Sequence, residues 1–325
     1  MDSSEYRRQY AEELKRQTEG QLGYQEFLEK SNSLSQRLSA LATRTSPLTE
    51  EELAASLDIL RDQKEEPALR ASALRAIGRE IGNREESINV LLELLQDKTQ
   101  PREVRVAALQ ALQMLAFISP LFMSKRPEFL AALRTIVDDP DGAIRQAALE
   151  ILAMEKDEYG QRRLNEGLDD PSRALVTPEK AVQLLGQDVH ADLYPRLREM
   201  IQNPPSPEAR EEAVRLLAGD PESRELLVSL LKDKDEDLKI RTFSAVALQS
   251  LDPAEFTEQA REIVLDNTEQ EPLRLTGLNG LTHFSDPAAS LLGDSIFDER
   301  IRQLIETSPS SQLREAAEQY LIRRR

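Results

Sequence analysis

The side chains that could do acid–base or metal chemistry are two histidines and many carboxylates. His190 and His283 stand 93 residues apart, and neither has an Asp, Glu, His or Cys in a spacing usual for a metal site on one helix face. The 59 Asp and Glu residues make every carboxylate pair equally possible, so none stands out as an acid/base pair. We therefore predict no catalytic residue, metal site or cofactor, and we interpret both histidines as ordinary helix-surface or inter-repeat residues.

Other features narrow the functional class further. The chain has no Cys, which excludes a disulfide, a thiolate metal site and a cysteine nucleophile. It contains no Gly-x-Ser-x-Gly elbow, no Walker lysine loop and no dinucleotide-binding glycine pattern. A formal net charge of −17 disfavours nucleic acid and anionic lipid as partners. Since no signal-peptide or membrane-spanning run is found either, we expect a cytoplasmic protein without membrane insertion.

One short pattern recurs along the chain: an arginine, two residues, a small residue and usually an aliphatic residue. It begins at Arg70, Arg105, Arg145, Arg210, Arg241, Arg274 and Arg314. The intervals are 31 to 40 residues, apart from one of 65 in which Pro178-Glu-Lys-Ala181-Val182 fits the pattern with proline in place of arginine. Intervals of this length are typical of arrays built from helix pairs.

The residues around each arginine follow a helical period. An aliphatic residue usually precedes the arginine, and apolar residues follow at the third, fourth and often seventh positions. Another amphipathic segment lies 15 to 25 residues earlier, separated by acidic, Pro and Asn residues that end one helix and start the next. We predict an all-α, right-handed superhelix of about eight helix pairs with an N-terminal cap. The pairs are expected near residues 50–81, 85–117, 127–154, 158–187, 190–218, 222–250, 254–283 and 297–323.

These helix pairs resemble HEAT repeats, in particular the short HEAT-like repeats of phycobilin lyase subunits. The matching elements are an aliphatic first helix, an acidic turn such as Asp139-Pro140-Asp141, the arginine with its preceding aliphatic residue, and the small residue after it. The resemblance covers roughly residues 47–325 and implies an armadillo-like α-solenoid. It also implies that the repeated arginines are structural and bridge to turn aspartates between units, for which the candidates are Asp141, Asp237 and Asp266.

Residues 1–46 differ from the repeats and are predicted to form a separate helical extension. They carry seven acidic and seven basic residues, so the whole net charge falls on residues 47–325. Tyr6, Tyr10 and Leu14 form an apolar stripe at helical spacing. Two interpretations remain: a cap over the first repeat, or a helix that binds a partner or a second copy. The oligomeric state is left open.

The second helix of each pair should expose the positions one, five and nine residues after its arginine. These positions carry both polar and apolar residues. The first of them, one residue after Arg70, is Ala71. The apolar residues on this face are candidates for partner binding, unless the assumed helix phase is wrong. They are Val106, Met114 and Met154, and separately Val246 and Leu275.

Two connections between helices are unusual. The connection after Arg105 holds Phe117, Leu121 and Phe122, which we expect to fold back into the core. Residues 169–178 have a proline near each end and no arginine at the repeat position, so an irregular joint is expected there.

Two functions follow from the sequence. The first is a non-catalytic scaffold or adaptor that presents a curved acidic surface to a protein partner, possibly a basic one. The second is suggested only by the resemblance to phycobilin lyase subunits, and would be an action on a tetrapyrrole-carrying light-harvesting protein. No residue of the sequence can be assigned to chromophore handling.

Overall fold

The computed structural model describes residues 36–37, 50–81, 84–188, 193–283 and 295–323. Within these ranges the chain consists of α-helices, short 3-10 turns and connecting segments, and contains no strand. Apart from Gln36 and Arg37, the predicted N-terminal extension of residues 1–46 lies outside the described residues, and so does His190. The prediction of an all-α fold is confirmed.

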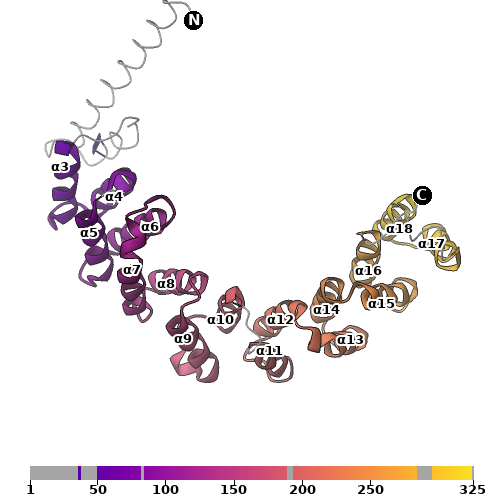
Figure 1. Ribbon diagram of the computed structural model, residues 1–325. Coiled ribbons are helices and arrows are strands. Elements are labelled where there is room, and N and C mark those ends of the chain that lie inside the picture. The colour runs from indigo at the N-terminus through magenta and orange to yellow at the C-terminus, as the bar shows by residue number, and fades with distance from the viewer. Residues whose placement is uncertain (1–35, 38–49, 82–83, 189–192, 284–294, 324–325) are drawn as a thin grey trace, which may run out of the picture. The chain divides into compact units, whose positions relative to one another are not determined.

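Consecutive helices can be taken two by two as first and second helices, near the ranges expected from the sequence (Figure 1). The first helices of these pairs are α3 (Glu50–Arg61), α5 (Glu85–Gln96), α7 (Phe122–Ile136), α9 (Glu158–Asp169), α11 (Leu193–Gln202), α13 (Arg224–Lys232), α15 (Pro253–Leu265) and α17 (Ser295–Thr307). The second helices are α4 (Pro67–Ile81), α6 (Arg102–Ile118), α8 (Gly142–Met154), α10 (Pro178–Leu185), α12 (Pro207–Leu216), α14 (Leu238–Leu251), α16 (Glu271–His283) and α18 (Ser311–Arg323).

Short polar residues and prolines set the beginnings of many helices. A side-chain oxygen placed just before a helix accepts hydrogen bonds from backbone N–H groups that have no partner within the helix. Proline at the first position loses nothing, because its missing N–H would have no helical partner there. The capping side chains are Asp141, Asp157, Ser206, Asp237 and Asp252. The helices that begin with proline include α10, α12 and α15.

Helix α7 begins five residues earlier than the sequence predicted. The sequence pattern placed the beginning of this pair near residue 127. Instead the helix starts at Phe122, whose backbone N–H donates to the Ser119 hydroxyl at 3.3 Å. Pro127 then lies inside the helix, close enough to its start that only a local hydrogen bond is lost.

The chain divides into two compact units, Met1–Glu155 and Lys156–Arg325, and we describe each by itself. In the first unit α4 packs against α6, and α5 packs against both α6 and α7. In the second unit the second helices α12, α14, α16 and α18 pack in sequence, with α11, α13, α15 and α17 along their other side (Figure 1). The predicted joint at residues 169–178 lies inside the second unit and is an exposed connection with one 3-10 turn, η1 (Pro171–Arg173).

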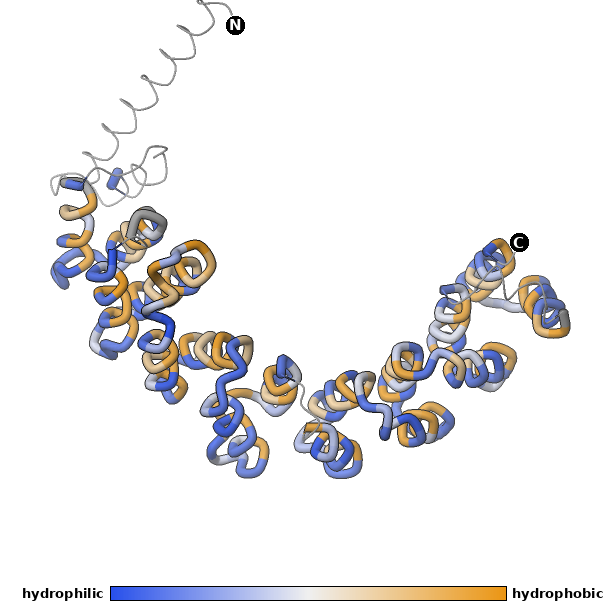
Figure 2. The backbone as a smooth tube through the Cα atoms, in the orientation of Figure 1, coloured by the Kyte–Doolittle hydropathy of each residue, from blue (hydrophilic) through white to orange (hydrophobic). Residues whose placement is uncertain are grey.

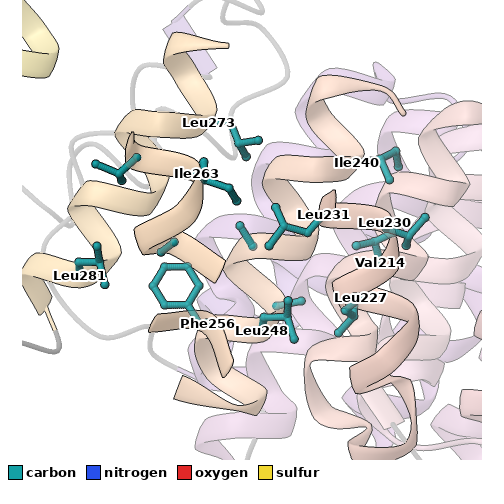
Figure 3. Packing of buried hydrophobic residues seen from close by; sticks show 14 of the residues in the cluster. Val214, Leu227, Leu230, Leu231, Ile240, Leu248, Phe256, Ile263, Leu273 and Leu281 are labelled. Atoms are coloured by element: carbon teal, nitrogen blue, oxygen red, sulfur yellow. The ribbon is translucent and has the colours of Figure 1, made fainter. Parts of the chain in front are cut away.

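One continuous hydrophobic core runs through the second unit, from Val182 on α10 to Tyr320 on α18. Figure 3 shows part of it, with Leu248 of α14 beside Phe256 of α15. Along the helices of Figure 2, hydrophobic and hydrophilic stretches alternate, as expected for helices with one buried face. Because no single helix pair can bury its apolar face alone, stacking of neighbours supplies the core.

Small residues let neighbouring helices approach closely in this core. Gly277 and Gly280 of α16 face α15, and a Cβ atom at Gly280 would lie 2.3 Å from Cζ of Phe256. The Phe256 ring is fully buried, so it has little room to move. The absence of a side chain at Gly280 is therefore a packing requirement of the α15–α16 contact.

Candidate partner-binding surface

The repeated arginines lie on the second helices and point back to the end of the first helix of the same pair. In five of them the guanidinium donates from Nε to a backbone carbonyl nine or ten residues earlier. The bonds are Arg70 to Leu60 at 2.9 Å, Arg105 to Leu95 at 3.0 Å, Arg210 to Ile201 at 2.9 Å, Arg241 to Leu231 at 2.9 Å and Arg274 to Val264 at 3.0 Å. The last carbonyls of a helix have no helical partner, and the arginine supplies one.

Four of these arginines also reach the turn of the next helix pair. Arg241 makes two hydrogen bonds to Glu269, of 2.9 and 2.8 Å, and Arg210 makes two to Glu236, both of 2.7 Å. The others are Arg70 to Gln100 at 2.8 Å and Arg105 to Asp139 at 2.5 Å. We call these arginines and their acceptors the arginine ladder, since each joins three chain segments within one compact unit.

Three repeated arginines bond within their own turns. Arg145 donates to the backbone carbonyl of Asp139 at 2.7 Å, and Arg314 donates to that of Ser308 at 2.6 Å, both in their own turns. Arg274 adds a bond of 3.2 Å to the side chain of Asn267. The same arginine position therefore supports either its own turn or the next one.

The acceptors predicted from the family resemblance were wrong. The turn residues that accept from the repeated arginines of the preceding pair are those of the ladder rather than Asp141, Asp237 and Asp266. Asp141 and Asp237 cap helices α8 and α14, and Asp141 also pairs with Arg102 of α6 at 2.6 Å. Asp266 pairs with Lys234 at 2.6 Å. A carboxylate immediately before a helix folds back onto the free N–H groups of that helix, which leaves it less available to a repeated arginine.

Arg37 is a ladder arginine that the sequence analysis missed. It donates to Glu65 in the α3–α4 turn at 2.8 Å, and both side chains are buried. The separation of 28 residues equals that between Arg241 and Glu269. The signal is present in the sequence, because Arg37-Leu-Ser-Ala-Leu41 fits the repeat pattern 33 residues before Arg70. The boundary between the N-terminal extension and the repeats, at residues 46 and 47, stays a prediction. Arg37 lies on the N-terminal side of this boundary.

The ladder makes stability depend on pH. Hydrogen bonds from Arg210 hold the pKa of Glu236 below its ordinary value, although burial acts in the opposite direction. A carboxylate with a depressed pKa stabilises the fold above its unfolded-state pKa, and this contribution is lost as the pH falls through the folded-state pKa.

We therefore expect the free energy of unfolding to decrease below a pH of about 4 to 5. The variant Glu236→Gln should be less stable than wild type at pH 7 and lose less stability on acidification. Urea denaturation over a pH series measures both. Glu299→Gln, at an exposed pair with Arg302, is the matched control and should follow the wild type. Parallel pH curves for all three proteins would contradict the assignment.

The predicted partner-binding residues differ in their exposure. Met154 and Val246 are 60% and 47% exposed, whereas Val106, Met114 and Leu275 are half-buried. The Met114 methyl group fills the space beside Gly78 on α4, where a Cβ atom would lie 2.9 Å away.

Two expectations about exposure were wrong, one from the helix phase and one for the connection after Arg105. Ala71, read at the same phase as Val106, is buried, because α4 is covered on that side. Phe117, which we expected in the core, is 88% exposed. Of the other two residues expected in the core, Leu121 is half-buried and Phe122 is fully buried, where it contacts Phe129 edge to face with centroids 5.3 Å apart. Phe117 stands twelve residues after Arg105, at the helical phase of the exposed positions, so extending the reading by one turn would have found it.

Phe117 has exposed apolar neighbours in the chain. Ile118 and Met123 are 52% and 62% exposed, at the end of α6 and the beginning of α7. The start of α7 is tied to the end of α8 by an ion pair between Arg126 and Glu155, next to Met154. We define the α6–α8 apolar surface as Phe117, Ile118, Met123 and Met154.

Val246 forms a smaller apolar patch on the second unit. It lies on α14 near Phe243, whose ring is covered by the Arg215 guanidinium at 4.0 Å from the centroid. Lys239 of α14 pairs with Glu211 of α12 at 3.2 Å. The cations beside both apolar surfaces are thus matched by carboxylates or aromatic rings, which leaves the apolar side chains as the distinctive feature.

Among the described residues we find no candidate metal site and no membrane-spanning helix. No group of three His, Asp or Glu among the described side chains could hold a metal ion. His283 is an exposed residue at the end of α16. None of the described helices has the length and hydropathy needed to cross a bilayer.

Comparison with known proteins establishes the family. A family model of HEAT repeats matches residues 53–153 and 194–279, which is more than half of the chain. The chain therefore belongs to the HEAT repeat family, and the resemblance inferred from its arginine pattern is confirmed. No curated protein matches the chain in sequence.

Solved structures agree with this fold. Kap95p, in a structure with RanGDP, superposes with a TM-score of 0.56 at 16% identity, over 94% of this chain and 46% of Kap95p. The chain thus spans less than half of Kap95p. Human deoxyhypusine hydroxylase in complex with glycerol gives 0.32 at 18% identity, over 96% and 98% of the two chains. The CpcE–CpcF complex of phycocyanin lyase from Nostoc gives 0.29 at 18% identity, over 86% and 96%. At 16% identity the likeness to Kap95p concerns the fold alone.

Proposed function

We propose that the protein is a non-catalytic scaffold or adaptor that binds a protein partner through exposed apolar side chains of its helix pairs. The observation that carries this proposal is the α6–α8 apolar surface, where four large apolar side chains are 52% to 88% exposed. Removing such side chains from water stabilises a complex by about 25 cal/mol per Å² of apolar area. Large apolar side chains that stay exposed on neighbouring helices mark a candidate interaction site.

The stacked architecture supports the same function. HEAT solenoids commonly bind protein partners, because rigid repeats hold contact groups at fixed spacing. In this chain Arg105 of the ladder joins α6 to the end of α5 and to Asp139 before α8, and so helps to fix the helices that carry the exposed side chains. Kap95p, which has the same fold, is itself described bound to RanGDP. From Kap95p we take only the idea that this fold binds a protein, and we do not infer that the partner is the same.

We further propose that the partner is basic or carries a basic segment. The formal net charge of −17 would attract such a partner and accelerate its association. Apolar contacts at the α6–α8 surface would then determine how long the complex lasts.

Affinity purification from the native cell followed by rate measurements tests this proposal. The association rate of the purified partner should decrease as ionic strength rises, since the Debye length shortens to about 8 Å at physiological salt. The dissociation rate should depend on salt much less. An association rate that is constant across ionic strengths would contradict electrostatic steering. Recovery of phycobiliprotein subunits as the stable partner would favour the lyase-like alternative over the scaffold.

A further inference from the structure

A groove lies between α9 and α11, the first helices of two consecutive pairs in the second compact unit (Figure 1). Its volume is about 680 Å³, within the range of pockets that hold a ligand. The apolar part of its lining consists of Leu168, Met200 and three prolines, Pro171, Pro195 and Pro205. Met200 is buried and Leu168 packs against the hydrophobic core, whereas the prolines are exposed. We call this the α9–α11 groove.

The groove lies in the helix pair that lacks the repeated arginine. Pro178 occupies the arginine position of α10, and α10 contains no arginine that could bond the end of α9. Instead Arg196 reaches across from α11, where its Nη2 donates to the Asp169 carboxylate at 2.6 Å and to the Asn165 carbonyl at 3.4 Å. Arg196 thus ties α9 to α11 and lines the groove between them.

Glu199 is the charged residue of the lining whose side chain has no ion pair or hydrogen bond within the described ranges. The other two charged residues, Asp169 and Arg196, pair with each other. Glu199 is exposed and is followed one turn later by Asn203, whose side chain also lines the groove. The groove therefore combines an apolar floor with one unmatched carboxylate.

The charges around the groove are negative in sum. Residues 158–173, which hold α9 and the turn after it, carry four acids and three arginines. Helix α11 carries Glu199 and two arginines. One of these, Arg198, pairs with Asp220 at 2.8 Å and with Glu222 at 3.0 Å, both in the turn before α13. Since Arg196 pairs with an acid of α9, neither arginine of α11 neutralises Glu199.

We infer that the α9–α11 groove binds an arginine side chain from the basic segment of a partner protein. An arginine has a long apolar stem and a charged, planar end that also packs well on apolar surface. The stem matches the prolines and Met200, and the guanidinium matches the Glu199 carboxylate, which can accept two parallel hydrogen bonds from it. The inference rests on the proposed function, because it names a group by which the basic partner is held.

Methyl NMR of the full chain, labelled with carbon-13 at the methionine methyl groups, tests the inference. Met200 reports on the groove, and Met123 and Met154 report on the α6–α8 apolar surface. The probe is the blocked peptide acetyl-Ala-Arg-Ala-amide at low salt, and the controls replace its arginine by citrulline, a neutral isostere, or by glutamate. We expect the arginine peptide to shift the Met200 resonance in a saturable manner and to leave the other two unmoved. The citrulline peptide should bind about threefold more weakly or worse, and the glutamate peptide should not bind.

Two variants separate the charge of the groove from its shape. Glu199→Gln removes the charge with little change in size and should weaken binding of the arginine peptide by about threefold or more. Asn203→Trp places a large ring in the groove and should weaken binding without any change in charge. Both residues are exposed, so the melting temperatures should stay near that of the wild type. Glu318→Gln, at an exposed carboxylate of α18, is the matched control and should bind like the wild type.

The inference is overturned if the arginine peptide leaves the Met200 resonance unmoved, or if the citrulline peptide binds equally well. Binding of the glutamate peptide would also overturn it and would assign the groove to an anion held by Arg196. Wild-type affinity in both groove variants would place the peptide elsewhere. A Met200 resonance that shifts when the protein alone is diluted would show that a second copy occupies the groove. None of these measurements uses the α6–α8 apolar surface, so the groove can fail while the proposed partner binding stands.

Discussion

Replacing Arg241 by alanine is expected to lower the free energy of unfolding by about 3 to 5 kcal/mol. The guanidinium is buried, bonds the Leu231 carbonyl at 2.9 Å and makes two hydrogen bonds to Glu269. Its removal would take both guanidinium hydrogen bonds from a buried carboxylate, which keeps only Lys234 at 3.7 Å as a cation, and would leave a helix end without its donor. Chemical denaturation followed by circular dichroism measures the change.

Substitutions of two other arginines provide stability losses with which this result can be compared. Arg145→Ala should cost about 1 to 3 kcal/mol, because this side chain supports a carbonyl of its own turn. Arg302, on the surface with Glu299, should cost less than about 1 kcal/mol. Equal stability of the Arg241→Ala variant and the wild type would show that the ladder does not hold the helix pairs together. Loss of partner binding without loss of stability would instead assign these arginines to a ligand.

Gly280→Ala is the second change with a large expected effect, a loss of about 1 to 3 kcal/mol. In an uncrowded helix interior the same substitution stabilises by up to about 1 kcal/mol, since alanine restricts the unfolded chain more than glycine does. At position 280 the added methyl group would lie 2.3 Å from the buried ring of Phe256. The clash therefore outweighs the gain in helix propensity.

A glycine with open space provides the control for this prediction. At Gly142 a Cβ atom would meet only the Arg145 guanidinium at 3.6 Å, so Gly142→Ala should be neutral or stabilising. Adding Phe256→Leu to Gly280→Ala should recover part of the lost stability by making room for the methyl group. Thermal melts that rank Gly280→Ala at or above the wild type would contradict the packing described for α15 and α16.

The helix pairs could be predicted from the sequence because their signals are local and repeated. The spacing of Arg241 and Arg274, with apolar residues at fixed distances from each, reflects one packing solution used again and again. Local signals also caused the one clear error in helix bounds, since Pro127 is compatible with both a helix start and the early part of a helix. Tertiary packing of Phe122 decided between them.

The functional surfaces could be predicted only in part. The exposure of Met154 follows from helix phase alone, and that of Phe117 could have been found in the same way. The ladder acceptors could not, because a turn aspartate can cap its own helix or reach the next pair, and only the folded turn decides which. The ion pair between Arg173 and Glu166 was also inaccessible, because it depends on the close passage of the backbone over Gly167.

The central claim is that exposed apolar side chains on the helix pairs bind the partner while the ladder only holds the helices in place. The most direct test is the affinity of the purified partner for a Phe117→Glu, Met154→Glu double variant, with Ile322→Glu as the control for an exposed apolar residue elsewhere. Phe117 is preferred to Met114 because Met114 also packs against Gly78. We expect the affinity of the double variant to be lower by about 30-fold or more, with an unchanged melting temperature. The Ile322→Glu control should bind the partner with wild-type affinity. Wild-type affinity in the double variant would contradict it.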